Sequence, residues 1–104
     1  MKNRGDGVSR IALIGIMVED NESARQINEI LHNYNEYIVG RMGIPRAKEN
    51  LSVISVVMDA PQDIISTVSG KLGRLTGVNV KTIYSKSSKA CEVKWYRKYV
   101  FTYR

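Results

Sequence analysis

Two segments of this sequence, residues 11–18 and 51–58, are apolar at almost every position. Both are rich in branched side chains, which favour strands, and successive residues of a strand point to opposite faces of a sheet. A strand that is apolar on both faces belongs in the middle of a sheet rather than at its edge. These segments are therefore predicted to be two central strands, and they constrain the placement of everything else.

Two helices and two weaker strands surround these segments. Apolar residues recur at spacings of three and four over about residues 21–34, which predicts a helix with Asp20 or Asn21 as its N-cap. Residues 37–44 form a weaker strand, and Pro45 should stop it because proline has no N–H to donate. Residues 45–50 are expected to be a polar turn.

A second helix should begin at Asp59-Ala60-Pro61-Gln62, where Asp59 can accept a hydrogen bond from the N–H of residue 62. Its apolar stripe runs to Leu75, and Gly77 is the expected left-handed residue after it. Residues 78–84 alternate as a fourth strand.

The resulting order, β-α-β-β-α-β, is that of the α+β ferredoxin-like sandwich. It predicts an antiparallel sheet of order 4-1-3-2 with both helices on one face. The outer strands carry Arg41 and Lys81, as suits exposed edges.

The other face of this sheet would show aliphatic side chains to water. Covering roughly 400 Å² of apolar surface is worth about 10 kcal/mol before association costs. We therefore expect this face to be buried in a homo-oligomer, a dimer or a tetramer, with a C-terminal segment folded back over it as the alternative. The residues concerned are Ile11, Leu13, Met17, Leu51, Val53 and Val57.

The chain divides into an expected disordered arm (1–10), a globular domain (11–84) and a basic aromatic tail or added strand (85–104). The net charge of the whole chain is +6, and most of it lies in the tail, which holds six Lys/Arg against one Glu. Five aromatic residues alternate with these cations. Such a tail could add a strand to a sheet or an oligomer contact, stay disordered, or bind single-stranded nucleic acid.

Few residues in the chain are suited to catalysis. His32 and Cys91 are the only histidine and cysteine, too few for a metal site or a nucleophile with its base. Gly70-Lys71-Leu72-Gly73 lacks the spacing of a phosphate-binding loop. Two glycines within a helix indicate instead a close approach by another backbone or by a ligand. We expect no enzyme, no metal and no cofactor.

Several motifs resemble the small bacterial family of iron-only hydrogenase system regulators. They are Val18-Glu19-Asp20, Asn28-Glu29-Ile30-Leu31-His32-Asn33, Gly43-Ile44-Pro45, Glu49-Asn50, Ser69-Gly70-Lys71-Leu72-Gly73 and Gly77-Val78-Asn79-Val80-Lys81-Thr82. The resemblance implies an ACT-like fold similar to the C-terminal domain of nickel-responsive repressors. It also implies oligomerisation through sheets and an effector at the interface. The ten residues before the first strand are too few for a ribbon-helix-helix arm, so we do not expect direct DNA binding.

The expected function is therefore a non-enzymatic regulatory module that binds a small effector or a protein partner. The alternative is a nucleic-acid-binding accessory protein that acts through the tail. The single cysteine, the absence of a signal sequence and the short apolar runs favour the cytoplasm and exclude a membrane span. Six residues are predicted to line an effector site: Asp20, Asn21, His32, Gly70, Lys71 and Gly73.

Overall fold

A single mixed sheet with helices on one face forms the core of the chain. The computed structural model describes residues 8–86, 89–90 and 99–102. The strands are β1 (Val8–Val18), β2 (Ile38–Lys48), β3 (Leu51–Ala60), β4 (Val78–Tyr84), β5 (Lys89–Ala90) and β6 (Tyr99–Thr102). They are ordered β4-β1-β3-β2-β6, and β5 pairs with β1. The central order 4-1-3-2 confirms the prediction.

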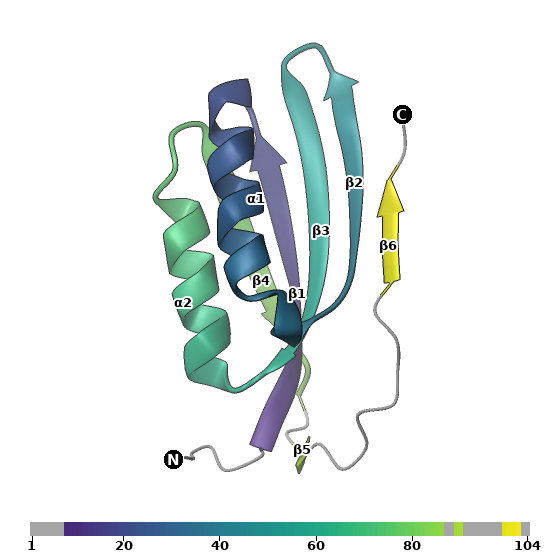
Figure 1. The fold of residues 1–104 in the computed structure, drawn as a ribbon, viewed down its shortest axis with the longest axis vertical. Helices are drawn as coiled ribbons and strands as arrows, with labels where there is room; N and C mark the ends of the chain where they lie inside the picture. Colours follow the sequence, from purple (N-terminus) through teal and green to yellow (C-terminus); the bar gives the residue numbers. More distant parts are fainter. Residues whose placement is uncertain (1–7, 87–88, 91–98, 103–104) are drawn as a thin grey trace.

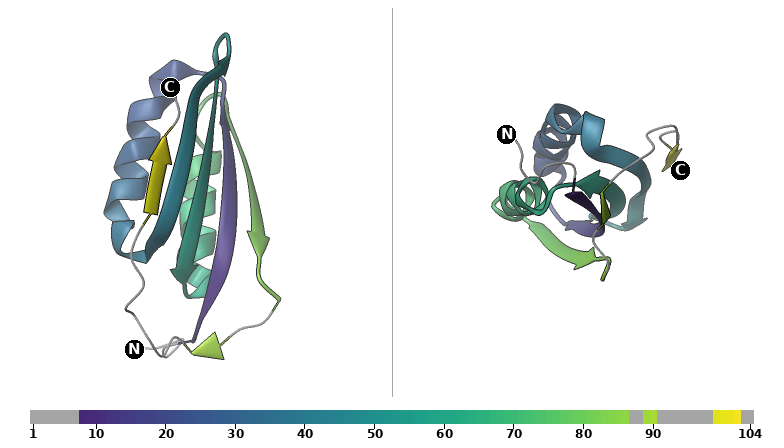
Figure 2. Two further views of the ribbon diagram at one scale, coloured as in Figure 1. Left: turned by 90° about the vertical axis from the view of Figure 1, so that its right-hand side faces the viewer. Right: turned by 90° about the horizontal axis from the view of Figure 1, so that it is seen from below.

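Two helices pack on the same face of this sheet (Figures 1 and 2). They are α1 (Ala24–Asn33) and α2 (Gln62–Gly73), and short 3₁₀ turns at Asn21–Ser23 and Asn35–Tyr37 flank α1. The Asp20 side chain accepts a hydrogen bond from the backbone N–H of Glu22 at 2.9 Å, as its predicted capping role requires. The fold is α+β and ferredoxin-like.

The hydrophobic core lies between the helices and the sheet. β1 and β3 pair antiparallel over nine positions, and alternate residues of each strand enter this core. Both helices contribute one apolar stripe. The fully buried large side chains are Ile14, Ile16, Ile27, Leu31, Met58, Ile65, Leu72, Val18, Val56 and Val68.

No helix of the described residues covers the opposite face of the sheet (Figure 2). Leu13 pairs with Val57 on one side and with Ile83 on the other, so these side chains form a continuous apolar row. Leu13 is 41% exposed and Ile83 is 65% exposed. The prediction of an apolar, helix-free face is therefore confirmed for the single chain.

The hairpin between β2 and β3 differs from the expectation. Pro45 does not end the strand: β2 continues to Lys48, and pairing resumes at Lys48 opposite Leu51 after a register shift. The interruption is local because Arg46 takes a left-handed conformation (φ 56°) and its N–H is satisfied by Ser52 Oγ at 3.1 Å. The turn itself is Glu49-Asn50.

Two other boundaries also move. Residues 8–10, expected in a disordered arm, belong to β1, where Arg10 pairs with Ala60. Asp59 does not cap α2, since it lies within β3 and accepts a hydrogen bond from Ser9 Oγ at 2.6 Å. Pro61 takes the N-cap position instead, without a side-chain hydrogen bond.

The described part of the tail contains one short strand beside β2. β6 runs parallel to β2, with Gly40 opposite Tyr99 and Gly43 opposite Thr102. Residues 91–98, which include Trp95, lie outside the described residues.

Candidate functional site

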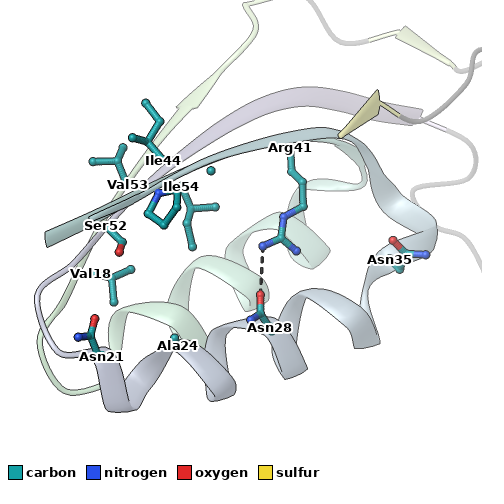
Figure 3. A pocket seen from close by; sticks show the side chains of 12 residues that line it. Val18, Asn21, Ala24, Asn28, Asn35, Arg41, Ile44, Ser52, Val53 and Ile54 are labelled. Carbon is teal, nitrogen blue, oxygen red and sulfur yellow. Dashed lines mark hydrogen bonds between the residues drawn. The ribbon is translucent and has the colours of Figure 1, made fainter. Parts of the chain in front are cut away.

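A groove opens on the helix side of the sheet, between α1 and the strands β2 and β3 (Figure 3). Its volume is about 430 Å³. It exists because the two helices cover β1, β3 and β4 more fully than β2, which lies at the far side of the four-stranded sheet. The lining residues are Val18, Asn21, Ala24, Asn28, Asn35, Arg41, Gly43, Ile44, Pro45, Ser52, Val53 and Ile54.

The inner part of the groove is apolar. Val18 and Ile54 point from the sheet toward α1, and Ala24 faces them from the first turn of that helix (Figure 3). Gly43 adds empty space, because a Cβ built there would meet no described heavy atom within 4 Å. An aliphatic group could therefore enter without displacing a side chain.

The charge in the groove comes from Arg41. Its Nη2 donates to Asn28 Oδ1 across the gap at 3.1 Å (Figure 3). A guanidinium has five N–H donors, so this bond leaves others for a ligand. The side chain is half-buried, and Arg41 is the one charged residue among the described residues that line the groove.

A bulge in β2 explains why Arg41 reaches this face. Ile38 pairs with Met58, but Gly40 pairs with Val57, so Val39 is an extra residue in β2. A shift of one residue exchanges the two faces of a strand. Arg41 therefore lies opposite the buried Val56, on the helix side. Sequence reasoning treated Arg41 only as an edge-strand charge, because alternation alone does not reveal a bulge.

A second, more polar cleft of about 660 Å³ lies where α1 begins. Ser23 Oγ donates to the carbonyl oxygen of Thr76 at 2.6 Å, which joins the start of α1 to the loop before β4. Gly77 in that loop has φ 71°, the left-handed conformation that was predicted, but α2 already ends at Gly73 with Arg74 as its C-cap, so Gly77 shapes the loop before β4 rather than the end of the helix. The lining residues are Asp20, Asn21, Glu22, Ser23, Arg25, Gln26 and Thr76.

The structure separates the six predicted site residues into two groups. Asp20 and Asn21 line the polar cleft, and Asn21 also lines the groove. The other four line neither: His32 is exposed in the last turn of α1, and Gly70, Lys71 and Gly73 are exposed on α2. Their role at an interface between copies stays a prediction.

The expected close approach to the α2 glycines has no counterpart within the described part of the chain. A Cβ at Gly70 or Gly73 would meet no described heavy atom within 4 Å. The neighbouring Lys71 Nζ lies 5.3 Å from the centre of the Tyr34 ring, a cation–π distance that ties α2 to the end of α1.

Neither metal ligands nor a membrane span is found in the part of the chain that the structure describes. No three His, Cys, Asp or Glu side chains gather there in a way that could hold a metal ion. No helix in the same residues has the length and apolar character to cross a membrane.

Comparison with known proteins identifies the family. The TM1266-like family model, described as "Iron-only hydrogenase system regulator, putative", matches residues 10–82. The chain belongs to this family. The matched residues hold the groove, both helices and the open sheet face, but not the tail.

A solved structure supports membership of the TM1266-like family. The uncharacterized protein TM1266 from Thermotoga maritima is 43% identical, with a TM-score of 0.71. The match covers 75% of this chain and 99% of that one. No curated protein matches the chain significantly. The resemblance noted in the sequence is thereby confirmed at the level of the family and its fold.

Proposed function

We propose that this chain is a non-enzymatic regulatory module of an iron-only hydrogenase system, which works as a homo-oligomer and responds to a small effector or a protein partner. The family description supports the regulatory role. The helix-free apolar face of the sheet is the observation that carries the proposal of an oligomer.

That face has the composition of an interface. Six large apolar side chains on this face or at the ends of its strands are exposed in the single chain: Val8, Ile11, Leu13, Met17, Met42 and Ile83. Large contiguous apolar patches are rare on monomers and mark surfaces that bind a partner. A second copy is the simplest partner, because one two-fold axis buries the same patch on both chains.

Light scattering coupled to size exclusion tests the oligomer. The wild-type chain should run as a dimer or tetramer at micromolar concentration. Leu13→Lys should run as a folded monomer, because the new charge would be buried without a partner. Asn33→Lys adds the same charge on an exposed position of α1 and should leave the mass unchanged. A monomeric wild type, or an oligomer that Leu13→Lys leaves intact, contradicts this interface.

The tail remains the basis of the alternative function. Its basic and aromatic residues lie mostly outside the described residues, so nucleic-acid binding through residues 86–104 stays a prediction from sequence. If the alternative holds, the full chain should give a salt-sensitive gel shift with single-stranded nucleic acid, and a shortened chain that ends at residue 85 should lose it. A full chain that gives no shift at low salt contradicts the alternative.

A further inference from the structure

We propose that the groove between α1 and β2 binds a small monocarboxylate with a short apolar chain, and that Arg41 holds its carboxylate. The inference rests on the proposed function, because it gives the chemical class of the effector and places it on the helix side of the sheet. It differs from the site predicted from sequence, which centred on the exposed surfaces of both helices.

The charge of the groove selects the head group. Within the described part of the chain, Arg41 is the one charged side chain that lines the groove, and its partner there is the neutral amide of Asn28. A guanidinium binds a carboxylate through two parallel N–H···O bonds. A single negative charge is thereby neutralised, whereas a dianion would bring a second charge that no other lining residue offsets.

The shape and polarity of the groove select the rest of the ligand. The sheet side chains beyond Arg41 that face α1 are the aliphatic Val18 and Ile54 together with the small hydroxyl of Ser52, and Ala24 lies on the opposite wall between Asn21 and Asn28 (Figure 3). The volume of about 430 Å³ is in the usual range for small-molecule sites. The space above Gly43 adds to this volume, since a Cβ there would meet no described heavy atom within 4 Å.

The β2 bulge is the second observation that favours a ligand. Bulges re-aim side chains next to functional sites. The extra residue Val39 turns Arg41 from the open face to the helix side. Arg41 is thus placed at the rim of the groove beside aliphatic side chains, bonded to Asn28 Oδ1 and with further N–H groups that an acceptor could take.

Titration of the full chain, followed by backbone amide chemical shifts, tests the proposal with hexanoate as the probe. Hexanoate should shift amides of β2 and of the first turns of α1. Hexan-1-ol and hexylammonium have the same chain without the negative charge, and each should bind at least about tenfold more weakly. Acetate has the charge without the chain and should also bind more weakly.

Two variants locate the site. Arg41→Gln should weaken hexanoate binding by about tenfold or more, whereas Arg74→Gln removes an exposed arginine outside the groove and should change nothing. Gly43→Val fills the empty space with a residue that strands favour, so it should fold and lose binding. If Arg41→Gln fails to fold, Gly43→Val and the three other probes still decide the outcome.

Three results would each overturn the proposal. They are the absence of shifts with millimolar hexanoate, equal binding of hexylammonium, and retention of binding in Gly43→Val. The proposed oligomer is measured separately, by mass and with Leu13→Lys on the opposite face. A dimer that ignores hexanoate therefore rejects the ligand alone, and a monomer that binds hexanoate rejects the oligomer alone.

Discussion

Gly77 shows how a single residue can fix the path of the backbone. Its φ of 71° is unfavourable for any residue with a Cβ, and a Cβ there would lie 2.6 Å from Asp20 Cβ. The backbone N–H of Glu19 also donates to the Gly77 carbonyl oxygen at 2.7 Å. The loop before β4 and the start of α1 therefore need glycine at this point.

Gly77→Ala should lower the free energy of unfolding by at least about 2 kcal/mol, from the left-handed conformation and the contact with Asp20. Urea denaturation measures this change. Gly70→Ala is the matched control: it lies in a helix with open space around it, and it should raise stability by about 0.5–1 kcal/mol. Destabilisation by Gly70→Ala would instead indicate a neighbour beyond the described residues, from this chain or from another copy.

Tyr37 gives the chain a pH dependence at alkaline pH. Burial, followed by the adjacent Glu36 carboxylate, raises the pKa of Tyr37 above its ordinary value of 10.0. The folded chain therefore holds the phenolic proton more tightly than the unfolded chain. The stability that follows is fully present below the unfolded pKa and is lost as pH rises through the folded pKa.

Tyr37→Phe should remove that loss. As pH rises above about 10, the free energy of unfolding should fall more steeply for wild type than for the variant. Urea denaturation at a series of pH values compares the two slopes. Equal slopes would mean that the Tyr37 pKa is the same in both states.

At the scale of the element, α2 depends on one buried stripe. Leu72 is fully buried against the sheet, whereas the residue before it, Lys71, is exposed. The helix also has no side-chain cap at its N-terminus. Packing of this stripe therefore supplies most of what holds the helix in place.

Leu72→Ala should cost about 2–5 kcal/mol, the range for a buried leucine that leaves a cavity. Lys71→Ala should cost less than about 1 kcal/mol, since it loses only an exposed cation–π contact with Tyr34. Thermal unfolding of both variants measures the difference. Similar losses would show that α2 is not anchored by this stripe.

The elements that the sequence predicted well are those set by periodicity. Strands β1 and β3, both helices and the position of Gly77 follow from local patterns of apolar residues and turn chemistry. The errors have a common cause: each depends on a contact between residues far apart in the sequence, which local patterns do not show. Asp59 is held in β3 by Ser9, fifty residues away, and the β2 bulge depends on its register with β3. The groove was missed for the same reason, because its cation faces inward only through that bulge.

At the scale of the whole molecule, the hydrophobic core of residues 8–86 lies within one continuous part of the chain. Among residues 8–86, every buried apolar residue lies between Ala12 and Leu72. β5 and β6 add only short pairings at the margins of the sheet. The predicted domain of residues 11–84 therefore includes all of that core.

A shortened chain that ends at residue 85 should still fold. It should keep the far-ultraviolet circular dichroism of two helices and a sheet, and it should unfold in one cooperative thermal transition. Loss of the transition would show that the tail is part of the folding unit. Stronger self-association than the full chain would show that the tail covers the open sheet face.

The bulge at Val39 decides which sides of the sheet Arg41 and Met42 take: Arg41, opposite Val56, faces the helices, and Met42, opposite Ser55, faces the open side. Substitutions of the β2 residues, made one at a time, should therefore fall into two alternating sets: those that change hexanoate binding in the groove and those that change the oligomer at the open face. The even and odd positions should exchange roles across Val39. One strand therefore forms a wall of the groove on one side and part of the open sheet face on the other. A change that displaces the β2 backbone should affect both surfaces.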